Sequence, residues 1–334
     1  MADTLRAGVI GCGVMGADHA RLYAEMADVE LAVVMDPAGA RARELAGLHG
    51  CEVCTDLDTV AEFGLDVVSI CVDDRYHREP AVRMAQCGTH ILMEKPLATT
   101  LEDCDAIIQA AQQAGVKLMV GHCVRFDPRY HSAHQAICRG DLGEISTAYA
   151  RRVNTLSTAR RIGGRVELPF YLGVHDIDIL RWLVGSEIRT VHAVASRKVL
   201  PTLGIDAADA YHATFGFDNG AIGALELSWA APDGMGWMLD AVCTITGTQG
   251  MVRIDVCGEG YTKADRSGVS GGGVTYGYEL GGRLYGALQA EVAHFVSCVV
   301  DDRPPLTANT DARRAVEVAI AMVESARTGA TITL

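Results

Sequence analysis

The chain has 334 residues, of which 42 are acidic and 29 are basic, and its formal net charge is −13. This length exceeds that of a typical single domain, and a hydrophobic content of 49% is enough for ordinary globular cores. The acidic balance argues against general binding to nucleic acid or to an anionic membrane surface, because both need a basic face. The sequence contains no apolar run of the ~18 residues that a membrane span needs and no signal-peptide pattern at its start, so we expect a soluble, cytoplasmic protein.

Eleven cysteines are spread irregularly along the chain, and most of them fall in apolar segments. This pattern favours reduced, buried thiols of a cytosolic protein over a disulfide framework. Cys51 and Cys54 form a C-x-x-C, but no second ligand pair follows at a spacing typical of zinc sites. His131 and His134 could share a helix face, although a solvated surface pair is the better explanation. We therefore predict no metal site.

The first part of the chain alternates apolar strands with amphipathic helices. The predicted strands cover 6–13, 29–37, 66–74, 90–96 and 117–122, and the predicted helices cover 16–27, 38–50, 77–88 and 100–115. Thr100 followed by Asp103 is an acidic form of the capping box. Alternation of this kind predicts parallel pairing with right-handed crossovers, and hence an α/β domain with a doubly wound sheet over residues 1–122.

Beyond residue 143 the pattern changes to short strands with period-two character. The predicted strands cover 144–154, 190–199, 209–217, 221–230, 240–248 and 250–258. Asn219-Gly220 joins two of them and is a strong hairpin signal. Residues 286–300 and 310–328 are predicted to be closing helices, which could pack back on the first domain. The glycine-rich stretch 267–286 is expected to be a long surface loop, with a mobile lid as the less favoured alternative.

A G-x-G-x-x-G motif lies between the first predicted strand and the first predicted helix. Glycines there permit a tight turn and close backbone approach, and the N-terminus of the helix offers free N–H groups to a pyrophosphate. The candidate pyrophosphate-binding residues are Gly11, Gly13, Val14, Met15 and Gly16. Asp36 ends the second strand, where a carboxylate binds both ribose hydroxyls and repels a 2′-phosphate. The motif therefore predicts a dinucleotide site for NAD, with NADP less favoured.

Two further segments carry candidate chemistry. Glu94-Lys95-Pro96 ends the fourth strand, at the sheet edge where doubly wound domains bind ligands, and the lysine could meet a substrate hydroxyl. The proline could hold a cis peptide bond, while a surface Glu–Lys pair remains an open alternative. The segment YLGVHDIDILRW, residues 171–182, places His175 and two aspartates in an apolar helix. Those charges belong either to a half-exposed helix or to a catalytic acid/base.

Taken together, these motifs and the segments AVRMAQCGTHILMEKPLA, VGHCVRFDPRY and GVHDIDILRW resemble the Gfo/Idh/MocA family of oxidoreductases, the glucose-fructose oxidoreductase and inositol dehydrogenase type. The resemblance covers essentially the whole chain. It implies a Rossmann domain over 1–122, followed over 123–334 by an α+β domain with a large, mostly antiparallel open sheet that serves substrate binding and oligomerisation. Homodimers or homotetramers are expected.

The activity that this resemblance implies is that of an NAD-dependent dehydrogenase or ketoreductase. It would act on a CH–OH group of a sugar, a cyclitol or a related polyhydroxylated small molecule. Two alternatives stay open: a non-catalytic regulator that senses a dinucleotide, and an NAD-dependent, redox-neutral glycosidase.

The resemblance also implies roles for individual residues. Lys95 would lie near the nicotinamide and the reacting oxygen, and His175 would act as the general acid/base. Val72 and His77 match the segment that covers the cofactor, and Glu94 would lie beside the nicotinamide ribose. Imidazole suits proton exchange near neutral pH.

The sequence departs from the family pattern in three places. Tyr171 stands where an aspartate is usual, four residues before His175; it could hydrogen-bond the substrate or the histidine but supplies no full negative charge. Val72-Asp73 replaces a Thr-Pro pair, and Cys123 replaces an asparagine.

Several polar residues of the second domain are candidates for substrate contact. They are Arg125, Arg152, Asn154, Arg161, Tyr171 and Asp176. The arginine-rich segment 151–165 could bind a phosphate or carboxylate, although a solvated loop or a subunit contact is slightly favoured. Asp178 is expected to be structural, as a cap or as a partner of Arg181.

Overall fold

The computed structural model describes residues 4–162, 164–235, 239–257, 262–265, 268–271 and 277–334. The chain divides into two compact units. Unit 1 comprises Met1–Cys123 and Glu279–Arg313, and unit 2 comprises Val124–Tyr278 and Arg314–Leu334. Within the described ranges, no helix combines the length and the apolar character that crossing a membrane requires.

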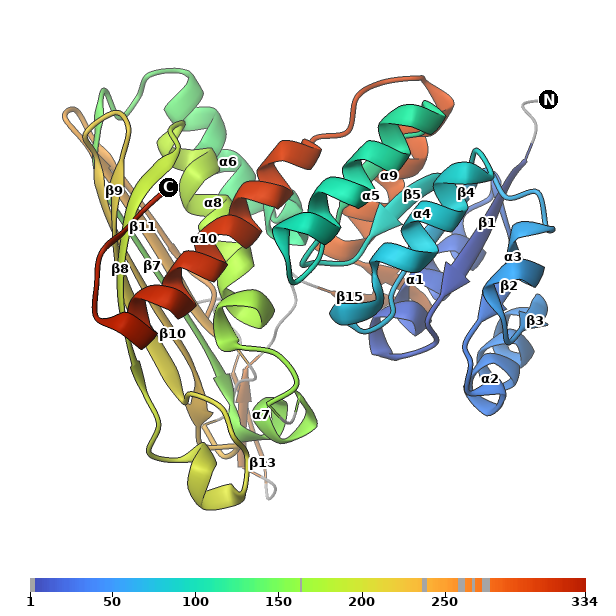
Figure 1. Ribbon diagram of the computed structural model, residues 1–334, viewed down its shortest axis with the longest axis horizontal. Helices are drawn as coiled ribbons and strands as arrows, with labels where there is room; N and C mark the ends of the chain where they lie inside the picture. The colour runs from blue at the N-terminus through green and yellow to red at the C-terminus, as the bar shows by residue number, and fades with distance from the viewer. Residues whose placement is uncertain (1–3, 163, 236–238, 258–261, 266–267, 272–276) are drawn as a thin grey trace. The chain divides into compact units, whose positions relative to one another are not determined.

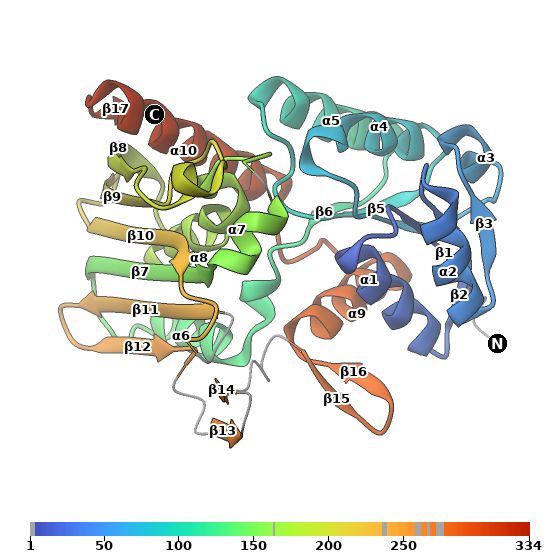
Figure 2. The ribbon, with the colours of Figure 1, turned by 90° about the horizontal axis from the view of Figure 1, so that it is seen from below.

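A six-stranded parallel sheet forms the centre of unit 1, as Figure 2 shows. Its strands are β1 (Leu5–Ile10), β2 (Val29–Met35), β3 (Glu52–Cys54), β4 (Val67–Ile70), β5 (His90–Met93) and β6 (Leu118–Val120). Their order is β3-β2-β1-β4-β5-β6, so the direction of winding reverses between β1 and β4. The predicted doubly wound sheet is confirmed. Ligands of such sheets bind outside the carboxyl ends of the strands at this reversal.

Helices cover both faces of this sheet. They are α1 (Val14–Glu25), α2 (Gly39–His49), α3 (Leu57–Ala61), α4 (Arg78–Gln86), α5 (Leu101–Ala114) and α9 (Ala287–Val300), with the 3₁₀ turn η1 (Asp74–Tyr76). Helices α1, α2 and α9 lie on one face, and α3, α4 and α5 lie on the other (Figure 2). Because the sheet is covered on both sides, its central strands are apolar throughout, and all of β4 is buried. The predicted cap of α5 is confirmed, since the Thr100 hydroxyl accepts a hydrogen bond from Asp103 N at 3.1 Å.

The glycine-rich stretch 267–286 is not the loop that was predicted. Its described parts form β14 (Gly268–Gly271), which pairs with β13 (Thr262–Asp265), and the two-stranded ribbon of β15 (Tyr278–Leu280) and β16 (Arg283–Tyr285). Residues 267 and 272–276 of this stretch lie outside the described residues. Backbone pairing overrides the weak strand propensity of glycine here.

A seven-stranded mixed sheet forms unit 2 (Figure 1). Its strands are β7 (Ile145–Thr155), β8 (Ile188–Ser196), β9 (Ala210–Phe217), β10 (Ile222–Ala231), β11 (Leu239–Gly247), β12 (Met251–Asp255) and β17 (Ile332–Thr333). They follow the order β12-β11-β7-β10-β9-β8-β17, in which β7 and β10 are parallel and the other described pairs are antiparallel. The predicted mostly antiparallel sheet and the hairpin at Asn219-Gly220 are confirmed, with Gly220 at φ +87°.

Helices cover one face of the unit 2 sheet (Figure 1). The helical segments are α6 (Pro128–Cys138), α7 (Leu156–Ile162), α8 (Val174–Val184) and α10 (Asn309–Thr328), with the short turns η2 (Cys123–Phe126), η3 (Pro169–Gly173) and η4 (Leu200–Leu203). Burial alternates along the strands, so that Leu225, Leu227 and Trp229 of β10 face the helices and are buried. On the opposite face, Tyr149 and Ile222 are among the exposed apolar side chains. One-sided burial of this kind is typical of antiparallel sheets.

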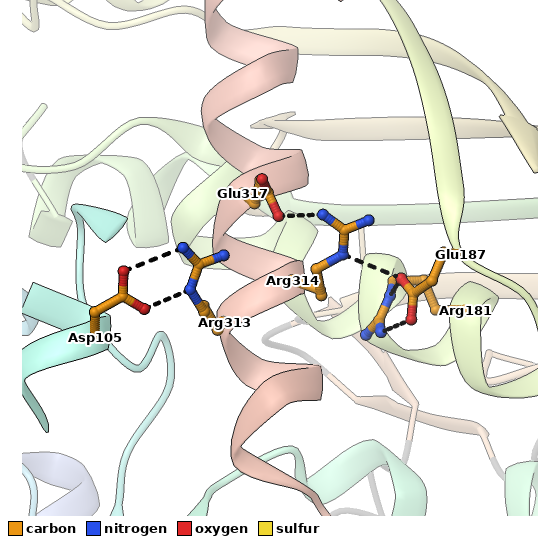
Figure 3. Close-up of polar contacts among 6 residues, drawn as sticks. All are labelled: Asp105, Arg181, Glu187, Arg313, Arg314 and Glu317. Carbon is orange, nitrogen blue, oxygen red and sulfur yellow. Dashed lines mark hydrogen bonds and ion pairs between the residues drawn. The ribbon is translucent and has the colours of Figure 1, made fainter. Parts of the chain in front are cut away.

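Helix α10 contributes to both units, because the division falls between Arg313 and Arg314. Figure 3 shows its two arginines, each paired within its own unit. Arg313 Nη2 lies 3.1 Å from an oxygen of Asp105 on α5. Arg314 Nε lies 3.4 Å from Glu187, which also accepts a hydrogen bond from Arg181 at 2.8 Å.

Candidate functional site

The outer glycines of the motif are required by the packing of the protein itself. Gly11 has φ +96°, and a Cβ at this position would lie 2.7 Å from the backbone of Cys71 and Val72, just after β4. A Cβ at Gly16 would lie 1.8 Å from the carbonyl oxygen of Gly11. These two glycines therefore let the loop fold back on itself and approach β4 closely.

The middle glycine is not required by contacts within the protein. A Cβ at Gly13 would meet no described atom within 4 Å, and its φ of −80° is open to any residue. Gly13 is the N-cap residue of α1, and Val14, the first residue of that helix, is 64% exposed. Backbone N–H groups of a first helical turn are the donors that a helix N-terminus offers to an anion. The open space above Gly13 thus fits the pyrophosphate of a dinucleotide.

Asp36 is fixed at the carboxyl end of β2, beside the glycine loop. It is 8% exposed, and its two oxygens accept hydrogen bonds from Cys12 N at 2.9 Å and from Ala38 N at 2.8 Å. Each carboxylate oxygen has a second lone pair, which can accept a ribose hydroxyl. The residues present therefore fit the adenosine half of NAD.

His77 joins the segments that follow β4 and β5. It is 1% exposed, with Nδ1 2.9 Å from the carbonyl oxygen of Pro96 and Nε2 3.3 Å from that of Val72. Burial lowers the pKa of His77, although hydrogen bonds to backbone carbonyls oppose the shift. The Lys95–Pro96 peptide is cis, as the sequence allowed. His77 thus positions two loops at the ligand edge of the sheet.

Lys95 and Glu94 follow β5 directly. Lys95 is half-buried, and its backbone N–H donates to Glu94 Oε2 at 3.2 Å. Glu94 Oε1 lies 3.3 Å from His19 Nε2. Burial alone would raise the pKa of Glu94, but the hydrogen bond and charge of His19, with Lys95 and His77, hold it below its ordinary value. The predicted contact of Glu94 with the nicotinamide ribose stays a prediction.

In unit 2, the histidine segment begins with one π-helical turn. Tyr171 lies in this turn, η3, and His175 lies in the first turn of α8; both are half-buried. Arg161 Nη2 donates a hydrogen bond to the Tyr171 hydroxyl at 3.0 Å. The structure therefore brings together two of the predicted substrate residues, Arg161 and Tyr171.

Two buried ion pairs hold α8 in place. Arg152 of β7 binds both oxygens of Asp176 at 2.6 and 3.0 Å, and Arg125 binds both oxygens of Asp178 at 2.7 and 2.6 Å. All four residues are at most 5% exposed. Bidentate pairing of this kind satisfies charges internally. Substrate contact by Arg125, Arg152 or Asp176 stays a prediction, and these contacts do not favour it.

The predicted local partner of Asp178 was Arg181, but the structure shows another one. Asp178 is paired with Arg125, 53 residues earlier, and Arg181 is paired with Glu187. The predicted structural role of Asp178 agrees with its burial. The i, i+3 spacing of Asp178 and Arg181 gave no sign of the long-range pair, which depends on tertiary packing.

Two other arginines of segment 151–165 also have partners inside unit 2. Arg151 binds Asp240 at 2.6 Å, and Arg160 binds Asp233 at 2.7 Å. Asn154, a predicted substrate contact, is half-buried, with Nδ2 3.5 Å from Thr158 Oγ1. These ion pairs therefore explain several arginines of this segment by a structural function.

Sequence analysis gave no role to His19 or Glu291, which lie beside Glu94. His19 Nδ1 lies 2.9 Å from Ser69 Oγ, and Glu291 of α9 lies close to both His19 and Glu94. These positions are far apart in the chain, so no spacing rule could have joined them.

Comparisons with known proteins agree with this geometry. A model described as the oxidoreductase family with an NAD-binding Rossmann fold matches residues 5–122, and a model of the GFO/IDH/MocA C-terminal domain matches residues 130–253. The chain is 28% identical to scyllo-inositol 2-dehydrogenase (NAD(+)) of Bacillus subtilis, over 100% of this chain and 97% of that one.

Two further matches are a curated protein and a solved structure. A 2,7-anhydro-N-acetylneuraminate hydratase of Escherichia coli is 28% identical over 75% of this chain and 67% of its own length. The crystal structure of scyllo-inositol dehydrogenase from Lactobacillus casei, with bound NAD(H) and scyllo-inositol, matches with a TM-score of 0.84, 21% identity and 99% coverage of both chains. At that identity the match establishes a shared fold.

Proposed function

We propose that this chain interconverts a secondary alcohol and a ketone of a cyclitol. It belongs to the Gfo/Idh/MocA family and is an NAD-dependent oxidoreductase acting on CH–OH groups. The observation that carries the proposal is the cradle of unit 1, where open space above Gly13 adjoins the fixed carboxylate of Asp36. The inositol dehydrogenase relatives favour a cyclitol over other polyhydroxylated small molecules.

Lys95 and His175 are the residues that we propose for the chemistry. In the direction of oxidation, His175 accepts the hydroxyl proton, and the ammonium of Lys95 stabilises the negative charge that develops on the oxygen. NAD, when bound, supplies the acceptor for the hydride that leaves the same carbon. In reduction the histidine returns the proton.

Tyr171 takes a positioning role in this proposal. Its hydroxyl accepts a hydrogen bond from Arg161, which fixes the ring so that it can orient the substrate or His175. A hydroxyl offers a hydrogen bond, so it stabilises an imidazolium less than the full charge of a carboxylate would. Replacing Tyr171 with phenylalanine should therefore lower kcat/KM by less than replacement of Lys95 does.

The open face of the unit 2 sheet is our proposed subunit contact. Four apolar side chains on it, Tyr149, Val194, Ile222 and Met251, are between 37% and 62% exposed. Exposed apolar and aromatic side chains among polar ones are typical of protein interfaces. We expect a homodimer or homotetramer by light scattering, and Ile222→Glu should shift it toward the monomer.

A second candidate reaction is redox-neutral. It is favoured by the E. coli relative, whose name describes a hydratase rather than a dehydrogenase. Such a reaction would convert its substrate without net formation of NADH. A dinucleotide sensor would bind NAD but would convert no substrate, with or without formation of NADH.

Formation of NADH from NAD across a panel of inositols, free sugars and sugar nucleotides tests the proposal. NADP is run in parallel, and products are analysed by mass spectrometry. NADH formed with an inositol supports the cyclitol proposal. Product without NADH would establish the redox-neutral reaction instead, and NAD binding with neither product would leave the sensor role.

A further inference from the structure

Three buried side chains of unit 1 converge close to the EKP segment. They are His19 of α1, Glu94 after β5 and Glu291 of α9, with exposures of 0%, 7% and 0%. One nitrogen or oxygen from each lies within 4.8 Å of those of the other two. His19 Nε2 and Glu94 Oε1 are already 3.3 Å apart.

Glu291 is the residue of this cluster that the fold does not explain. Neither of its carboxylate oxygens has a hydrogen-bond partner among the described residues. A buried carboxyl group without a partner is costly to the folded state, which points to a ligand that compensates it.

Gly121 lies next to both carboxylates. It follows β6, and a Cβ at this position would lie 3.3 Å from Glu291 Oε1 and 3.4 Å from Glu94 Oε1. Its φ is not in the left-handed region, so the backbone does not require glycine here. The absence of a Cβ at Gly121 leaves room beside the two carboxylates.

We propose that His19, Glu94 and Glu291 bind a divalent transition-metal ion of the Mn²⁺ or Zn²⁺ class within the dinucleotide-binding unit. One imidazole and two carboxylates form a donor set that such ions accept. With metal–ligand distances of ~2.0–2.2 Å, neighbouring ligand atoms of a tetrahedral site are about 3.4 Å apart. His19 and Glu94 already meet this spacing, with 3.3 Å between Nε2 and Oε1, and an oxygen of Glu291 lies within 4.8 Å of both ligand atoms.

The surroundings of His19 fit a metal ligand. Its other ring nitrogen, Nδ1, lies 2.9 Å from Ser69 Oγ, and Ser69 Oγ lies 2.8 Å from the Tyr23 hydroxyl. Imidazole ligands typically have such a hydrogen bond on the nitrogen that does not bind the metal, which fixes the orientation of the ring. The prediction of no metal from the sequence considered local spacings, whereas this cluster joins three distant segments. The proposal does not depend on the substrate or on the direction of the reaction.

The test uses the full chain, treated with a chelator and then titrated with Mn²⁺ while free Mn²⁺ is followed by electron paramagnetic resonance. Mn²⁺ is the probe because it prefers nitrogen and oxygen ligands to the eleven free thiols of the chain. We expect one tightly bound Mn²⁺ per chain and a higher Tm in its presence. Glu291→Gln should weaken binding at least about tenfold, and it should be as stable as the wild type without metal, since it removes a buried acid.

Glu102→Gln is the matched control, because it removes an exposed carboxylate of the same unit. It should bind Mn²⁺ as the wild type does. If Glu291→Gln fails to fold, Gly121→Ala narrows the site without removing a ligand and should also weaken binding. A wild type that binds no stoichiometric Mn²⁺, or a folded variant of Glu291 or Gly121 that binds it as tightly as the wild type, would overturn the proposal; the cluster would then hold only a proton.

Discussion

Replacing Gly13 with alanine should impair dinucleotide binding without impairing folding. The backbone of Gly13, at φ −80° and ψ −162°, is accessible to alanine, and the added methyl group meets no described atom within 4 Å. The unfolded chain has fewer conformations with alanine than with glycine, which stabilises the folded variant by about 0.4–1 kcal/mol. Alanine is a poorer N-cap residue than glycine by a similar amount, roughly 0.5–1 kcal/mol. The free energy of unfolding should therefore change by less than about 1 kcal/mol.

The affinity for NAD should change much more. The methyl group of Gly13→Ala would enter the space that we assign to the pyrophosphate and would separate it from the N–H donors of α1. Loss of one hydrogen bond to a charged group costs about 1.5–3 kcal/mol, which raises the Kd for NAD about 10- to 150-fold. Isothermal titration calorimetry measures the Kd, and urea unfolding measures stability.

Gly16→Ala is the matched control, because it adds the same methyl group three residues later. That group would lie 1.8 Å from the carbonyl oxygen of Gly11, so the loop must move, at a cost of roughly 3 kcal/mol in the free energy of unfolding. If Gly13→Ala bound NAD as tightly as the wild type, the pyrophosphate could not lie above Gly13. If Gly16→Ala were as stable as the wild type, the described loop geometry would be wrong.

Three further substitutions test other parts of the account. Asp178→Ala leaves the buried guanidinium of Arg125 without its bidentate partner, and urea unfolding should show a loss of roughly 3–5 kcal/mol, against no loss if the pair were unimportant. Asp36→Ser should raise the KM for NAD and lower that for NADP, whereas unchanged values would remove Asp36 from the ribose site. Burial raises the pKa of Asp209, but three hydrogen bonds outweigh the effect of burial and lower this pKa below its ordinary value. Their donors are the backbone N–H groups of Leu200, Lys198 and Val199. The folded pKa is thus below the unfolded one, so this stabilisation is present above the unfolded pKa and is lost as pH falls through the folded pKa. Asp209→Asn should therefore destabilise the protein near neutral pH but not in acid, and a difference independent of pH would contradict this reasoning.

Local sequence patterns were enough to predict most strands of both sheets and several of their turns and caps. The glycine motif, the cap at Thr100 and the hairpin at Asn219-Gly220 each combine residue type with a backbone requirement, and each is present in the structure. The three-residue strand β3 and the five-residue helix α3 were not predicted. Segments this short carry too few residues for a periodic signal, and the packing of the sheet determines them.

Polar pairing in the site could not be predicted in the same way. Asp178 has an arginine three residues later, yet it pairs with Arg125 because the fold brings that side chain to α8. Likewise, the sequence gives no sign that Glu291 lies close to His19, since the contact joins helices α9 and α1, which are far apart in the chain. Ion pairs and clusters between distant segments depend on tertiary structure, for which a single sequence gives no distances.

Transfer of a labelled hydride tests the central claim most directly. The protein is incubated with NAD and an inositol deuterated at the carbon that is oxidised, and the reduced nicotinamide is examined by proton NMR. We predict that deuterium appears at C4 of the nicotinamide in proportion to the ketone formed, and that Lys95→Ala slows its appearance by about 10²- to 10⁴-fold while the Kd for NAD is retained. Ketone formed without label in the nicotinamide, or a Lys95→Ala variant with the turnover of the wild type, would contradict the account.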